Sequence, residues 1–212
     1  MAKVLITRPD YDDVTFYLSK WSNTIIKKAE AVGHRVVDLR SKRATRQTFE
    51  SVVEGSKPRL ILLNGHGSND SVAGQAGEVI LDKRNIKILK AKLVHAFSCS
   101  AAKELGQMAV DSGCEAFAGY TAPFLFIIDN NKSNTPLRDN VARPFFESAN
   151  TLPLVLLKGR KMKDAVKEAK AAYSRWIIYY RTHTTLEGAD VLPYLIWNLS
   201  ILAYSGSDSA SL

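Results

Sequence analysis

Short apolar runs alternate with longer stretches of helical periodicity along most of this 212-residue chain. The apolar runs end in glycine, serine or polar residues, which is typical of parallel strands buried on both faces. Strands are expected at 4–6, 36–39, 92–97, 115–120 and 199–204, at a run that starts at residue 60, and more weakly at 79–81 and 124–128. This alternation predicts an α/β fold in which helices cover both faces of a mostly parallel sheet.

The stretches between these runs repeat apolar residues every three or four positions and therefore predict helices. They lie at 12–32, 45–54, 101–112 and 192–198, and two more begin at Thr135 and after Gly159. Asp12 is well placed to cap the first helix, and Gly33 to end it. Residues 205–212 are small and polar, so we expect a disordered tail after a single domain at 1–204.

Two of the expected strands each end in one reactive side chain. The run Leu60-Ile-Leu-Leu-Asn-Gly-His66-Gly67-Ser68 reaches a histidine, and Leu93-Val-His-Ala-Phe-Ser-Cys99-Ser100 reaches a cysteine. In open α/β sheets, chemistry collects beyond the carboxyl ends of the strands. An imidazole and a thiol at two such ends are what a cysteine nucleophile and its base require.

The residues around this pair fit acyl transfer. His66 and the start of the helix expected near Ala101 would both lower the pKa of the Cys99 thiol. Gly67 has no Cβ, so its N–H can face a developing oxyanion, and the N–H of Cys99 is the natural second donor. The sequence identifies no third group that would orient the imidazole.

The order strand-His-Gly, then strand-small-Cys, resembles the caspase-like (clan CD) cysteine peptidases, and among them the CHAT-domain and gingipain-like branch. The resemblance is carried by Asn64-Gly-His-Gly-Ser68, Phe97-Ser-Cys-Ser-Ala101, Leu105-Gly106, residues 113–120, the helix after Gly159 and residues 192–198. It implies a three-layer αβα sandwich with a mostly parallel six-stranded sheet. It also implies that His66 is the catalytic histidine, Cys99 the nucleophile, and Gly67 with Cys99 the oxyanion hole. Ser98 departs from the Ala or Glu that many members carry before the cysteine.

This resemblance predicts a cysteine endopeptidase that forms an acyl-enzyme and cuts after a charged residue. Asp70, Glu78 and Asp129 are the acidic residues expected near the active edge, and they favour Lys or Arg in the substrate. Arg138 would instead suit an acidic residue. One alternative is an inactive caspase-like module that binds a protein partner in a signalling or defence assembly. Another is a flavodoxin-like or Rossmann-like ligand binder in which the histidine and cysteine are incidental.

Charge and composition limit the classes of molecule that the protein is expected to bind. Formal net charge is +8, and residues 158–181 hold eight basic residues against two acidic ones. Without a nucleic-acid-binding motif, this segment is interpreted as a solvated helix face, and we expect a protein or peptide substrate but no nucleic acid. No apolar stretch is long enough to span a bilayer and no signal peptide is recognisable, so we expect a cytoplasmic protein that does not engage membranes.

The remaining histidine and cysteine positions suggest no cofactor. Cys99 and Cys114 are expected to be free thiols, with Cys114 packed as a small hydrophobe and His95 inside its strand. His66, Asp70 and Cys99 lack the paired spacing of a zinc site, so no metal is expected. The glycines near His66 lack the pattern of a phosphate-binding loop, which argues against a nucleotide. The oligomeric state and the activating signal are left open.

Overall fold

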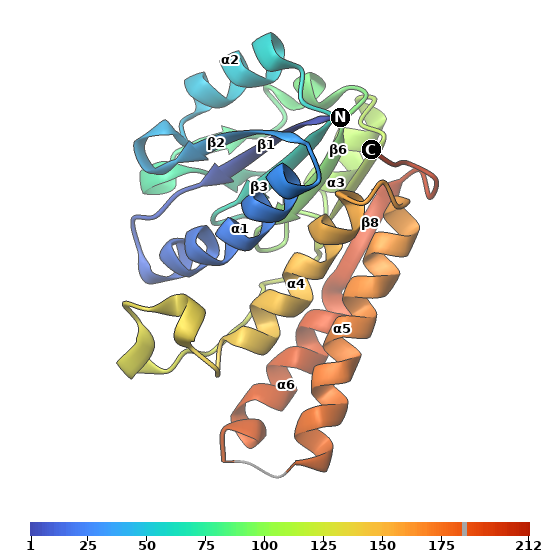
Figure 1. Cartoon of the computed structure of the whole chain (residues 1–212). Coiled ribbons are helices and arrows are strands. Elements are labelled where there is room, and N and C mark those ends of the chain that lie inside the picture. The colour runs from blue at the N-terminus through green and yellow to red at the C-terminus, as the bar shows by residue number, and fades with distance from the viewer. Residues whose placement is uncertain (184–185) are drawn as a thin grey trace.

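A six-stranded sheet lies between two layers of helices in the computed structural model, which describes residues 1–183 and 186–212 (Figure 1). The strand order is β2-β1-β3-β6-β7-β8. The strands are β1 (Lys3–Arg8), β2 (Arg35–Arg40), β3 (Leu60–Asn64), β6 (Leu93–Phe97), β7 (Ala116–Tyr120) and β8 (Leu202–Gly206). The first five are parallel, and only β8 runs antiparallel, against β7. The expected three-layer sandwich with a mostly parallel six-stranded sheet is confirmed.

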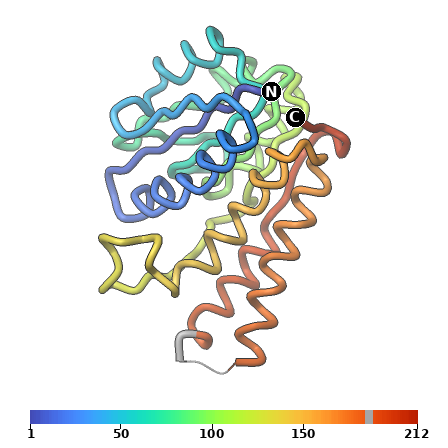
Figure 2. The backbone as a smooth tube through the Cα atoms, viewed as in Figure 1, coloured from blue at the N-terminus to red at the C-terminus, as the bar shows by residue number. Residues whose placement is uncertain are grey.

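The two faces of the sheet carry different sets of helices. One face packs against α1 (Asp13–Ala31), α4 (Arg143–Leu156), α5 (Met162–Thr182) and α6 (Leu186–Ile201), and the other against α2 (Arg46–Ser56) and α3 (Leu105–Asp111). Alternation along each strand fills both cores: in β1, Val4 and Ile6 face the first set of helices and Leu5 faces the second. The pair α5 and α6 extends beyond the sheet, and both chain termini lie at the opposite end of the molecule (Figure 2).

The connections contain short elements. These are the antiparallel pair β4 (Val72–Ala73) and β5 (Val79–Leu81), and the 3₁₀ turns η1 (Ser41–Arg43), η2 (Gln75–Gly77), η3 (Ile86–Leu89), η4 (Asn130–Lys132) and η5 (Pro136–Arg138). The helix expected from Thr135 is divided: η5 comes first, and α4 begins only at Arg143. Asp139 separates the two because its buried carboxylate accepts the N–H groups of Val141 and Ala142 at 2.9 Å each.

The helix expected directly after Cys99 starts later than the sequence suggests. Ser100 has a φ of 57°, and residues 100–104 form turns, so α3 begins only at Leu105. The N–H of Ala102 bonds to Tyr120 O at 3.0 Å, which draws this turn towards β7. The prediction of a helix over 101–112 is therefore wrong in its first turn.

Two expectations near the C-terminus also differ from the structure. The helix expected at 192–198 is the longer α6, so the last strand begins at Leu202 instead of residue 199. The tail expected to be disordered is packed: β8 continues to Gly206, and Ala210 is only 6% exposed. The N–H of Met162 donates to Ala210 O at 2.8 Å, so an apolar contact and a backbone hydrogen bond hold a segment whose composition is polar.

Candidate active site

His66 and Cys99 line the same cavity, at the carboxyl edge of the sheet. Strands β3 and β6 are parallel neighbours, with Asn64 opposite Phe97, and each reactive residue lies two positions beyond its strand. The cavity is completed by Val14, Leu18, Gly65, Phe97, Ser98, Phe124 and Phe126. Its volume is about 20 Å³. That is room for about one water molecule.

The backbones of Gly67 and Cys99 touch. A Cβ built on Gly67 would lie 2.5 Å from Cys99 O and 3.2 Å from Cys99 N, closer than such contacts allow. Only glycine therefore fits at position 67, for a reason of space and not of backbone dihedral angle. The two N–H groups expected to stabilise an oxyanion thus belong to peptides packed against each other.

Asp12 supplies the imidazole partner that sequence reasoning missed. Its Oδ2 lies 2.7 Å from His66 Nε2, so this nitrogen donates to the carboxylate. Asp12 is the N-cap of α1, where its Oδ1 accepts the N–H of Thr15 at 2.8 Å. The signal was present, because Asp12 follows β1 and β1 is the sheet neighbour of β3.

The electrostatics of the site set the charges of these groups. Burial by itself would raise the pKa of Asp12, but hydrogen bonds from Thr15 and His66 outweigh it and lower the pKa, so Asp12 is ionised at neutral pH. Burial raises the pKa of the Cys99 thiol, whose Sγ donates to Phe124 O at 4.0 Å. The expected depression of the Cys99 pKa by an adjacent helix start is therefore wrong, because α3 begins six residues later and the sulfur is desolvated.

Burial also determines the state of three other polar side chains, those of Ser98, His95 and Cys114. Ser98 Oγ is buried and has no hydrogen-bond partner in the part of the chain that the structure describes. Burial lowers the pKa of His95 to about 3 and raises that of Cys114 to about 12. The Cys114 thiol donates to Lys92 O at 3.3 Å, as expected of a packed residue.

None of the acidic residues proposed from sequence to select the substrate lines the Cys99 cavity. Asp70 accepts a hydrogen bond from Ser68 Oγ at 2.7 Å, in the turn that follows His66. Glu78 accepts the N–H of Arg46 at 2.9 Å at the start of α2, and Asp129 accepts that of Asn131 at 2.9 Å. Arg138 lines a separate cavity with Lys20 and residues 134–137. The structure brings the histidine and cysteine together but does not gather these charges around them.

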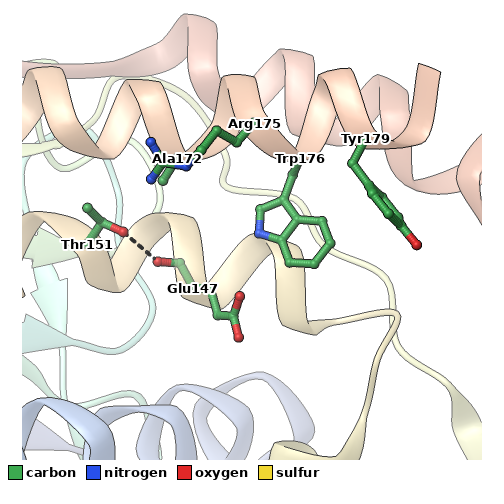
Figure 3. A pocket seen from close by; sticks show the side chains of 6 residues that line it. All are labelled: Glu147, Thr151, Ala172, Arg175, Trp176 and Tyr179. Atoms are coloured by element: carbon green, nitrogen blue, oxygen red, sulfur yellow. Dashed lines mark hydrogen bonds between the residues drawn. The ribbon is translucent and has the colours of Figure 1, made fainter. Parts of the chain in front are cut away.

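A much larger cavity lies elsewhere, between α4 and α5 (Figure 3). It measures about 520 Å³ and is lined by Glu147, Thr151, Ala172, Arg175, Trp176 and Tyr179. It shares no lining residue with the cavity at Cys99. Over the described residues, no three His, Cys, Asp or Glu side chains are grouped to hold a metal ion. Nor does any described helix combine the length and apolarity needed to cross a bilayer.

The six-stranded sheet and its two helix layers match the caspase-like fold. A solved structure with this fold is the Arg-specific cysteine proteinase gingipain R (RgpB), with a TM-score of 0.64 and 12% sequence identity. The likeness covers 99% of this chain and 47% of gingipain R, so the chain spans about half the length of that protein. No protein-family model and no curated protein matches the sequence. The likeness shows the fold, and assignment to the CHAT-domain branch stays a prediction.

Proposed function

We propose that the protein is a cysteine endopeptidase in which Cys99 is the nucleophile and His66 its acid–base partner. One observation carries the proposal: an imidazole fixed by a carboxylate and a free thiol line one cavity at the carboxyl edge of a caspase-like sheet. The carboxyl edge is where such sheets place their chemistry. The substrate would be a protein or peptide, with no cofactor required.

The proposed reaction uses the atoms of this cavity. The Cys99 sulfur attacks the peptide carbonyl carbon, and its proton passes to His66 Nδ1. The N–H groups of Gly67 and Cys99 donate to the oxyanion of the tetrahedral intermediate. The intermediate collapses, the C–N bond breaks, and the imidazolium returns the proton to the leaving amine. Water, deprotonated by His66, then hydrolyses the thioester and frees the thiol.

Asp12 supports both halves of this cycle. Its carboxylate accepts the Nε2 hydrogen, which keeps the Nδ1 lone pair available and stabilises the imidazolium once it forms. The lowered pKa of Asp12 keeps that carboxylate charged at neutral pH. It is therefore proposed as a positioning residue for His66.

We further propose cleavage after Lys or Arg. The carboxylate that supports this preference is Asp70, which lies four residues after His66, in the Ser68–Ser71 turn. Fluorogenic peptides ending in Arg, Lys or Asp test it directly. Turnover of the Asp peptides alone would contradict the preference.

The central test compares two single-cysteine losses. Cys99→Ala should abolish cleavage of a peptide library, whereas Cys114→Ala should leave it unchanged. Equal cleavage by the parent and by Cys99→Ala would rule out this mechanism.

The inactive binding module is a second candidate, favoured by the raised pKa of Cys99 and its small cavity. Iodoacetamide at pH 6 separates the two, because a catalytic thiol should react much faster than Cys114 and should lose that advantage in His66→Ala. Equally slow labelling of both cysteines, together with no cleavage of any peptide by the parent, would favour the binding module.

A further inference from the structure

Residues 123–126, named the strap below, cross the cavity that holds Cys99. They follow β7 without regular secondary structure, and the exposure of their side chains alternates. Phe124 and Phe126 line the cavity, whereas Leu125 between them is 38% exposed. The sequence predicted a strand here from the run at 124–128, but these residues lie outside the sheet.

Side chains of α6 hold the backbone of the strap. Asn198 Oδ1 accepts the N–H of Leu125 at 3.0 Å, and Asn198 Nδ2 donates to Leu125 O at 2.6 Å. Trp197 Nε1 donates to Pro123 O at 2.8 Å. Asn198 is fully buried, so its amide pairs with Leu125 as a neighbouring strand would.

The strap in this position covers part of the approach to Cys99. Phe124 packs edge-on against Phe97 with ring centroids 4.7 Å apart, and its carbonyl oxygen accepts the Cys99 thiol. Attack requires a peptide carbonyl carbon about 3–3.5 Å from the sulfur. The space beside the sulfur is only about 20 Å³, whereas Cys99 itself is partly exposed and the His66 side chain is 43% exposed. A strap that moved away would therefore widen the approach of a peptide to Cys99.

We propose that Asn198 is a positioning residue that holds the strap closed over Cys99, so that α6 controls the access of peptide substrates to the sulfur. This inference rests on the proposed peptidase function. Among the described hydrogen bonds, those of the buried Asn198 amide go to Leu125 alone. Loss of the pair removes two hydrogen bonds that only the closed strap makes.

Alkylation of Cys99 in the full chain measures strap opening, with Cys114 as an internal reference. Iodoacetamide rates are followed from pH 6 to 9 in the parent, Asn198→Leu and Trp197→Phe. Trp176→Phe on α5 is the matched control, because the Trp176 indole lines the cavity between α4 and α5 (Figure 3), which shares no lining residue with the cavity at Cys99. Asn198→Leu should raise the Cys99 rate about tenfold, from loss of two hydrogen bonds. Its rate profile should also move to lower pH, because opening relieves the burial of the thiol.

Trp197→Phe removes one surface hydrogen bond and should produce a smaller increase with the fold intact. Unchanged Cys99 rates in both variants, with native circular dichroism, would overturn the proposal. If Asn198→Leu also accelerates Cys114, the whole fold has loosened, and Trp197→Phe decides: selective acceleration of Cys99 supports the strap, and no acceleration refutes it.

Peptide cleavage by the same proteins distinguishes this inference from the proposed function. Faster Cys99 labelling in a protein that cuts no peptide would uphold the strap and refute the peptidase. Cleavage by the parent together with unchanged labelling in the variants would uphold the peptidase and refute the strap.

Discussion

Replacing Asp12 by serine separates the two roles that the structure gives this residue. The Asp12 side chain caps α1 through Thr15, and its other oxygen accepts the Nε2 hydrogen of His66. Serine is as good an N-cap as aspartate but is too short and uncharged to replace the carboxylate at the imidazole. Asp12→Ser should therefore keep the helix and lose the orientation of His66.

The sizes of the two effects follow from the contacts. An N-cap is worth about 1 kcal/mol, so Asp12→Ala should cost that much stability, whereas Asp12→Ser should stay within about 0.5 kcal/mol of the parent. A hydrogen bond to a charged group contributes about 1.5–3 kcal/mol. The His66 and Asp12 side chains are 43% and 37% exposed, so water screens their pairing. We therefore expect about 1.4–2 kcal/mol of transition-state stabilisation to be lost, which is about a 10- to 30-fold fall in kcat/KM.

Urea unfolding and peptide cleavage are measured on the parent, Asp12→Ser and Asp12→Ala. The expected pattern is similar stability but reduced kcat/KM in the serine variant, and losses of both in the alanine variant. A serine variant that retained kcat/KM within twofold would show that Asp12 does not act through His66. A serine variant as unstable as the alanine variant would show that the cap is not replaceable and would refute the separation of roles.

Three further predictions concern single side chains. Gly67→Ala should abolish cleavage, because the new Cβ would meet Cys99 O at 2.5 Å, and activity retained at half or more would contradict this contact. The pKa of His95 is about 3 in the fold, against about 6.5 in the unfolded chain. The contribution of this group to the free energy of unfolding is therefore fully present above pH 6.5 and is lost below it by up to about 1.4 kcal/mol per pH unit. His95→Leu should flatten that slope in urea unfolding between pH 7 and 4, and an unchanged slope would refute it. Hydrogen bonds from Arg84 lower the pKa of Asp82, so Asp82→Asn should lower the free energy of unfolding at pH 7. The difference in unfolding free energy between parent and variant should shrink below about pH 4, and a difference independent of pH would contradict this linkage.

Local sequence signals predicted the central part of the fold and the reactive pair. Apolar runs ending in small residues predicted the five parallel strands, because burial on both faces leaves few polar positions. The sequence also predicted that Asp12 begins a helix and that His66 and Cys99 follow strands. Their meeting in one cavity depended on β3 and β6 being adjacent, which the resemblance implied and the structure shows.

Features that depend on distant contacts were missed. The composition of the tail suggested disorder, but Arg59, directly before β3, donates to Ser211 O at 2.9 Å and holds the tail. The turn after Cys99 has helical composition, yet the N–H of Leu105 bonds to Asn69 O at 2.8 Å, which fixes where α3 begins. Both of these features are held by a partner more than thirty residues away, and periodicity carries no information about such partners.

Because β8 is antiparallel to β7, α6 lies next to the segment that covers Cys99 Sγ. Because Tyr120 pairs with Leu202, the segment that leaves β7 and the helix that enters β8 meet at the same edge of the sheet. The N–H of Thr121 bonds to Ile201 O at 2.9 Å, and the N–H of Ser100 bonds to Ala122 O at 3.1 Å. A displacement of α6 would thus move Thr121 directly, and through the segment that follows Thr121 it would move Ser100, which is next to Cys99. A parallel final strand would have brought its preceding segment to the other edge and left the cavity without this cover.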